Sequence, residues 1–183
     1  MIDGMVEHMA WLHNRAGTRL ECVEQEIKHE SFYNTCYNKA IFKGCWFRNI
    51  AFSNCTFLDT MFYSCKFYLC TFSNCRFNGA LFSGDMDRCV FNYCDWRKAK
   101  VFQHLFHGQS ITGTKFDFPI IRIDIAPWTI TVLKDQTMIG CQTRSNSFWL
   151  DPCIDEINEM DEQALEWWQA NGSIIQAAIR RVS

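Results

Sequence analysis

Hydrophobic residues recur with a period of five through the middle of the chain. Phe stands at every fifth position from Phe42 to Phe82, and a mostly small residue precedes each Phe by two positions. The pattern skips one residue after Phe82 and resumes in weaker form as far as Phe116. A period of five fits neither an α-helix nor a flat strand, whose side chains repeat every 3.6 and 2.0 residues. It fits a chain that turns a corner every five residues, with one small and one large inward side chain and three outward ones.

The flanking segments follow other patterns. A short helix and a strand-like lead-in are expected before the repeats, and the five-residue pattern stops after Pro119. Alternating hydrophobic residues then predict strands at 128–133 and 138–142. Helical spacing predicts one helix from about Asp151 to Asn171–Gly172 and a last helix after it. We therefore expect three regions: an N-terminal helix and lead-in at 1–30, repeats at 31–118, and strands with two helices at 119–183.

The small-plus-large pattern of residues 37–118 resembles that of the pentapeptide repeat family, A-(D/N)-L-x-x, with Cys replacing most alanines and Phe replacing Leu. This resemblance implies a mainly β fold: a right-handed quadrilateral β-helix, a solenoid with four pentapeptides per coil. An N-terminal helix and a C-terminal α/β cap would cover its ends, which would otherwise expose unpaired backbone. The segment His8-x-x-Trp11-Leu12 and the C-terminal strings I-G-C-Q and A-L-x-W-W resemble phage-encoded or prophage members of that family.

Composition supports this interpretation, because the sequence holds 16 Phe and 11 Cys. The register places Cys45 beside Cys65, and Cys55 beside Cys75, in successive coils. These cysteines are expected to be reduced core residues, since parallel side chains in a packed ladder have poor geometry for a disulfide and a free Cys behaves as a small hydrophobe. Neither a metal nor a cofactor is expected. The seven cysteines in the small inward position are Cys45, Cys55, Cys65, Cys70, Cys75, Cys89 and Cys94.

Candidate catalytic residues are few, and the chain is not expected to be an enzyme. His104 and His107 resemble a ligand pair, but the register points His104 inward and His107 outward. Asp85 and Asp87 share one outer face and are interpreted as part of a solvated loop. No nucleophile motif, phosphate loop or paired-carboxylate signature is present. A catalytic site on Cys141 or Cys153 is a third hypothesis that rests on residue type alone.

The outward positions carry the functional prediction. One face of the coil combines large apolar residues in a way that a solvated wall does not need. Aromatic and arginine side chains, which are common interface anchors, stand at its margin. A partner protein, the chain's own C-terminal segment or a second copy in a homodimer could cover this face. The predicted binding residues are Ile41, Met61, Tyr63, Leu81 and Phe102, with Trp46, Arg48 and Tyr68 at the margin.

Charge narrows the classes of partner. The chain has a formal net charge of −2; residues 30–118 hold ten Lys/Arg against six Asp/Glu, and residues from 119 hold five against nine. A topoisomerase inhibitor that imitates DNA would need dense negative charge. A coil with a net charge of about +4 is therefore a poor mimic of DNA. It also lacks the basic groove with stacked aromatics expected for direct nucleic-acid binding.

The apolar runs and the N-terminal segment predict where the protein is located. Apolar runs fall far short of the roughly 20 residues that span a bilayer, and residues 1–17 lack the apolar core of a signal peptide. A cytoplasmic protein without membrane contact is expected, in the host cytoplasm if it is phage-encoded. The leading hypothesis is a non-enzymatic protein that binds or inhibits a host protein, such as a DNA-processing or phage-defence enzyme. The alternative is a structural or assembly module, a rigid spacer that associates with itself.

Overall fold

The computed structural model describes residues 2–182, apart from the side chains of Gln103 and His104. The chain divides into two compact units, Met1–Asp117 and Phe118–Ser183. Within the described residues, no helix combines the length and the apolar character needed to cross a membrane.

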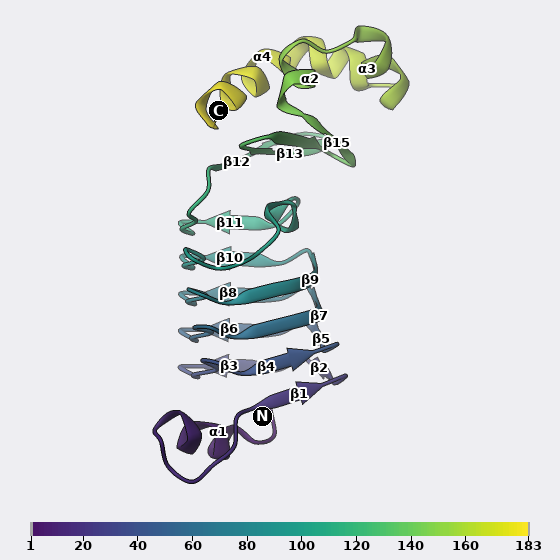
Figure 1. The fold of residues 1–183 in the computed structure, drawn as a ribbon. Coiled ribbons are helices and arrows are strands. Elements are labelled where there is room, and N and C mark those ends of the chain that lie inside the picture. Colours follow the sequence, from purple (N-terminus) through teal and green to yellow (C-terminus); the bar gives the residue numbers. More distant parts are fainter. Residues whose placement is uncertain (1, 183) are drawn as a thin grey trace. The chain divides into compact units, whose positions relative to one another are not determined.

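The first unit is a β-solenoid built from short parallel strands (Figure 1). Each strand pairs with a strand about 20 residues further along: Phe32 lies beside Phe52, and Phe52 beside Phe72. This spacing gives four five-residue sides per coil, so the predicted quadrilateral β-helix is confirmed. Its strands are β1 (Glu21–Val23), β2 (Glu26–Lys28), β3 (Ser31–Tyr33), β4 (Ile41–Lys43), β5 (Trp46–Arg48), β6 (Ala51–Ser53), β7 (Met61–Tyr68), β8 (Thr71–Ser73), β9 (Leu81–Asp87), β10 (Val90–Asn92) and β11 (Ser110–Thr112).

Four walls surround the core of the coil. The first wall contains β1, β4 and the first halves of β7 and β9, and the second contains β2, β5 and the second halves of β7 and β9. The third wall runs β3-β6-β8-β10-β11. Isolated bridges form the fourth wall, joining Cys36, Thr56, Arg76, Asp95 and Lys115 in succession.

Stacked aromatic rings fill the inside of the coil. The Phe47 and Phe67 rings stack with centroids 4.5 Å apart, and the Phe57 and Phe77 rings with centroids 4.9 Å apart. The seven predicted small-position cysteines are all buried, and their thiols donate to backbone carbonyls of the preceding coil; Cys75 Sγ lies 3.4 Å from the Phe52 oxygen. All eleven cysteines are unpaired in the structure.

Corner residues adopt a left-handed backbone at every fifth position. Asn49, Asn54 and Asn74 have φ of 52°, 55° and 53°, a conformation that Asn tolerates because its short polar side chain bonds locally. The corner residue is missing in the fourth coil, where the strand register shifts between Tyr63 and Cys65. Gly84 lies opposite Cys65, and a Cβ there would lie 1.9 Å from the Cys65 carbonyl oxygen. The skip in the sequence pattern is therefore one deleted corner residue.

The coil begins earlier than the predicted start at residue 31. Glu21–Val23 and Glu26–Lys28 pair with β4 and β5, so part of the expected lead-in belongs to the stack. The helix α1 (Met5–Leu12) precedes it, and the buried His8 accepts a hydrogen bond at Nδ1 from the Leu20 backbone N–H, 3.0 Å away. The last coil contains a short 3-10 helix, η1 (Gln103–Phe106).

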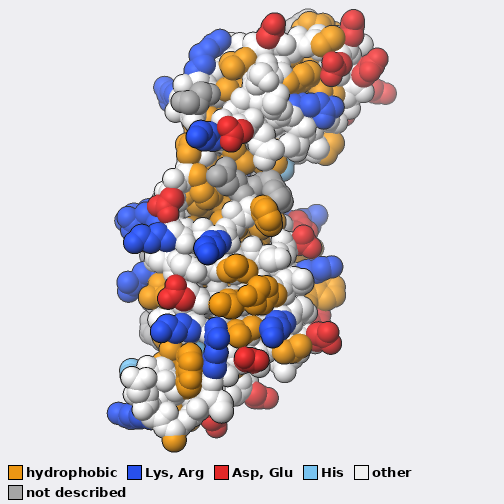
Figure 2. All heavy atoms as spheres, viewed as in Figure 1, with side chains coloured by type: hydrophobic (Ala, Val, Ile, Leu, Met, Phe, Trp, Pro, Cys, Tyr) orange, Lys and Arg blue, Asp and Glu red, His pale blue; other side chains and the backbone are white. Residues whose placement is uncertain are grey.

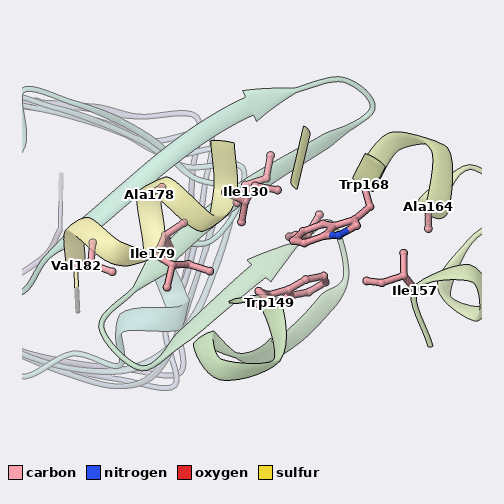
Figure 3. Close-up of a cluster of buried hydrophobic side chains, with 11 residues drawn as sticks. Ile130, Trp149, Ile157, Ala164, Trp168, Ala178, Ile179 and Val182 are labelled. Carbon is pink, nitrogen blue, oxygen red and sulfur yellow. The ribbon is translucent and has the colours of Figure 1, made fainter. Parts of the chain in front are cut away.

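The second unit is an antiparallel sheet with three helices. Its strands, in the order β12-β13-β14-β15, are β12 (Ile120–Ile125), β13 (Trp128–Leu133), β14 (Gln136–Ile139) and β15 (Gln142–Ser145). Its helices are α2 (Asn146–Leu150), α3 (Ile154–Met160) and α4 (Ala164–Val182). Figure 3 shows the core, in which Trp149, Trp168 and Ile179 are buried among aliphatic side chains of the sheet and helices.

Several predictions for this unit were wrong in detail. The strand expected at 138–142 is split by the turn at Gly140–Cys141 into β14 and β15. The helix expected to end at Asn171–Gly172 instead breaks after Met160, and α4 runs through Gly172. Gly172 serves packing here, because a Cβ at that position would lie 2.8 Å from Cε2 of Trp168.

Candidate protein-binding site

Strand register places four of the five predicted apolar residues on one wall, and the fifth, Phe102, lines a hollow together with Leu81. Ile41, Met61 and Leu81 lie in one column, and Lys43, Tyr63 and Ser83 lie in the column beside it. Figure 2 shows hydrophobic side chains gathered over β4, β7 and β9, with lysine and arginine side chains on either side. We call the set Ile41, Met61, Tyr63, Leu81 and Phe102 the apolar face.

Members of the apolar face differ in exposure. Phe102 is 65% exposed and Tyr63 is 37% exposed, whereas Ile41 is only 8% exposed. Met61 and Leu81 are half-buried. The Tyr63 hydroxyl donates to Met61 Sδ at 3.1 Å, which orients the ring. The accessible part of the face is thus the portion around Tyr63 and Phe102. Ile41 lies beside Met61 in the neighbouring strand and is buried.

An open hollow adjoins Phe102 on the same wall. It is lined by Leu81, Ser83, Lys100 and Val101 together with Phe102. Such a hollow beside an exposed aromatic ring offers both a pocket and a protruding anchor, which are the features that concentrate binding energy at protein interfaces.

The marginal residues form an ordered cluster on the second wall. The Arg48 guanidinium lies 4.8 Å from the Trp46 ring centroid and 6.0 Å from that of Tyr68. It also pairs with Glu26 at 3.2 Å. Hydrogen bonds from Lys28 and Arg48 lower the pKa of Glu26. The cation–π contacts keep the Arg48 side chain against the two rings, so it is ordered before any partner arrives.

Exposed lysines lie near the apolar face on two walls. Lys43, Lys66 and Lys100 are exposed on the first two walls. The binding residues predicted from the sequence did not include these lysines. Asp85 and Asp87 are also exposed, but they lie in strand β9 rather than in the predicted loop. The surface around the face is therefore mixed in charge, with these lysines on the first two walls, Asp85 and Asp87 in β9, and the exposed Glu21 beside Ile41 in β1.

The apolar face itself is made of aliphatic, thioether and aromatic side chains, and none of its five residues is a His, Cys, Asp, Glu, Ser or Lys. A hydrogen bond with Cys75 and burial raise the pKa of the Cys55 thiol, so it stays protonated at neutral pH. His107 is half-buried, and the predicted inward orientation of His104 lies outside the described side chains. Within the part of the chain that the structure describes, no cluster of three His, Cys, Asp or Glu side chains could hold a metal ion.

Comparisons with known proteins bear on the fold. No family model and no curated protein matches the chain. Solved structures that resemble it include a pentapeptide repeat protein from the thylakoid lumen of Arabidopsis thaliana, with 17% identity, a TM-score of 0.42, and coverage of 55% of this chain and 70% of that one. A second is the pentapeptide repeat protein Rfr23 from the cyanobacterium Cyanothece 51142, with 8% identity, a TM-score of 0.33, and coverage of 53% and 60%.

A third solved structure is QnrB1, a plasmid-mediated fluoroquinolone resistance protein. It has 16% identity, a TM-score of 0.17, and coverage of 55% of this chain and 92% of that one. Pentapeptide repeat proteins are thus among the structures that resemble this chain. Identities and scores this low transfer no activity, so the function must be argued from the residues on the walls of the coil.

Proposed function

We propose that this protein is a non-enzymatic binding protein whose coil presents the apolar face to a partner protein. The observation that carries the proposal is the alignment of large apolar side chains on one wall, with Tyr63 37% and Phe102 65% exposed. The third wall differs, because its outward columns hold mostly small and polar side chains such as Ser53, Ser73 and Thr112.

The charge around the face indicates the chemistry of the partner. An interface typically has an apolar centre and a polar rim, and here the rim contains Lys43, Lys66 and Lys100. A partner surface with an apolar or aromatic centre and acidic margins would complement it. Such complementarity raises the association rate and selects against basic surfaces, including a second coil of the same charge.

The rigidity of the coil favours binding. The rings beneath the face are stacked, with Phe42 and Phe62 at 5.2 Å and an interplanar angle of 8°. A wall supported in this way loses little conformational freedom when a partner docks, and avoiding that entropy loss improves affinity.

A narrower form of the proposal names a host protein, such as a DNA-processing or phage-defence enzyme, as the partner. Its support is the resemblance of the N- and C-terminal segments to phage-encoded proteins, together with the apolar face. Inhibition by imitating DNA is the weaker version, because the ten Lys/Arg and six Asp/Glu of residues 30–118 give the coil the wrong charge.

Self-association as a rigid spacer is the second candidate. The observation in its favour is the opposite charge of the two segments, about +4 for residues 30–118 and −4 from residue 119 onward. Coil and C-terminal unit of different copies could therefore attract one another, weakly and in a salt-dependent way.

Paired variants on two walls test the proposal. Tyr63→Glu with Phe102→Glu adds charge to the apolar face, and Ser53→Glu with Thr112→Glu adds the same charge to the third wall. We expect the wild type and the third-wall variant to retain one and the same partner protein from a host lysate, and the face variant to lose it while keeping its circular dichroism spectrum. Light scattering that shows a stable homo-oligomer, with no partner that depends on the face, would instead support the spacer.

A further inference from the structure

A pocket lined by tryptophan lies within the C-terminal unit. Trp128, Trp149, Trp167 and Trp168, four of the seven tryptophans in the chain, line it together with Met160 and Asp161. The cavity has a volume of about 60 Å³, several times the roughly 10–15 Å³ that one water molecule needs. It is large enough for a small organic group.

The rings are fixed in place by two contacting pairs. Trp149 and Trp168 have centroids 5.3 Å apart, and Trp128 and Trp167 have centroids 5.0 Å apart in an edge-to-face arrangement. In Figure 3 the rings of Trp149 and Trp168 lie next to each other, and Ile157 points toward them.

Two hydrogen bonds and Gly140 also help to fix the positions of these rings. The indole N–H of Trp149 donates to the Thr137 carbonyl at 2.9 Å, and that of Trp167 donates to the Ala126 carbonyl at 3.0 Å. Both donors are therefore satisfied by backbone. A Cβ at Gly140 would lie 2.8 Å from the Trp128 ring. The Trp128 ring therefore fits against this turn only because residue 140 has no side chain. The pocket is thus preformed.

The electrostatic surroundings of the pocket are acidic. Asp161 is exposed beside it, and its Oδ1 accepts a hydrogen bond from the Gln163 backbone N–H at 2.9 Å. Met160, the last residue of α3, also lines the pocket, which places the partly negative end of that helix there. Residues 145–179 contain seven Asp/Glu and no Lys or Arg, and Figure 2 shows acidic side chains gathered over the region of α3.

We infer that this pocket binds a quaternary ammonium group. Tryptophan faces attract a cation through their ring quadrupole, more strongly than the other aromatic residues do, and the attraction increases when the cation is desolvated. Methyl groups on the nitrogen bury apolar surface against Met160 and the rings. The Asp161 carboxylate at the rim attracts the cation as well. An anion would instead be repelled by the acidic segment and by the partly negative end of α3.

A matched pair of ligands tests this assignment on the full-length protein. Choline and its neutral isostere 3,3-dimethyl-1-butanol have the same shape and differ in charge. Titration followed by tryptophan fluorescence and by the indole N–H signals in NMR should give a Kd for choline of about 1 mM or lower. The isostere should bind at least about tenfold more weakly. Equal binding of the two would show an apolar pocket without cation selectivity, and no binding of choline would overturn the proposal outright.

Variants and a second ligand locate the site and its natural source. Asp161→Asn keeps the hydrogen-bond acceptor and should weaken choline binding about five- to tenfold, while Glu162→Gln, a neighbouring acid outside the lining, should weaken it less than about twofold. Trp128→Leu should weaken binding more strongly with an unchanged circular dichroism spectrum. The affinities of a trimethyllysine peptide and of choline should then be compared. Tighter binding of the peptide would indicate that the group belongs to a modified protein, and tighter binding of choline would indicate a free cation. If Asp161→Asn and Glu162→Gln behave alike, the pocket assignment is wrong.

Discussion

Phe57 gives the sharpest test of how the coil is held together. Its side chain is 1% exposed, and its ring stacks between Tyr37 at 5.2 Å and Phe77 at 4.9 Å. Phe→Ala in a core costs about 3–5 kcal/mol, and each lost aromatic pair adds about 0.5–1.5 kcal/mol beyond buried area. Since the surrounding stack is rigid and collapses poorly onto a cavity, we expect Phe57→Ala to cost about 5 kcal/mol.

Urea unfolding followed by far-ultraviolet circular dichroism measures this cost. Phe57→Leu, which keeps most of the volume but loses both stacked pairs, should cost about 2 kcal/mol. The matched control is Phe102→Ala, where the same atoms are removed from a ring that is 65% exposed and the expected cost is about 0.5 kcal/mol. A cost for Phe57→Ala below about 1.5 kcal/mol, or equal to that of Phe102→Ala, would refute the stacked-core reasoning.

Three further predictions follow from the described geometry. Gly84→Ala should destabilise the coil by about 3 kcal/mol in the same assay, since a Cβ would lie 1.9 Å from the Cys65 carbonyl oxygen; an unchanged unfolding midpoint would argue against this register. Burial lowers the pKa of His8 from its ordinary 6.5, so the stability contributed by the neutral ring is present above pH 6.5 and is lost as the pH falls toward the lower folded value. A His8→Gln variant should therefore show a smaller fall in urea midpoint between about pH 8 and pH 5 than the wild type. A thiol reagent should react rapidly with the exposed Cys141 and Cys153 and with the eight buried cysteines only after unfolding; rapid reaction of more than three thiols in the folded protein would contradict the predicted core.

Much of the coil could be predicted because its period is set by geometry. A chain that turns every five residues must repeat its inward positions at that spacing, so the sequence identified the stacked phenylalanines and the neighbours Cys45 and Cys65. The first half of the first coil was missed because its inward large positions hold Cys22 and Ile27 rather than Phe. The pattern was present there, but the residue types concealed it. The left-handed corners of that half are Glu24 and His29 rather than the Asn or Gly found at many later corners, so they gave no signal either.

The alignment of the predicted apolar residues could be derived from the five-residue period, but their exposure could not. Register alone aligned Met61 with Leu81, whereas the burial of Ile41 depends on how side chains on neighbouring strands lie across it. Long-range packing also decided the C-terminal unit: Gly172 was taken for a helix end, yet it lies inside α4 against Trp168. The tryptophan pocket assembles residues 40 positions apart, from Trp128 to Trp168, and no local spacing signals that arrangement.

Affinity for the captured partner tests the central claim most directly. Isothermal titration of the purified partner should compare the wild type, Tyr63→Glu with Phe102→Glu, and the third-wall control Ser53→Glu with Thr112→Glu. Two buried charges opposite apolar surface should weaken binding at least about a hundredfold, equivalent to about 2.8 kcal/mol, while the control should stay within about twofold of the wild type. Equal affinity of all three proteins, or an equal loss in both variants, would contradict the assignment of binding to the apolar face.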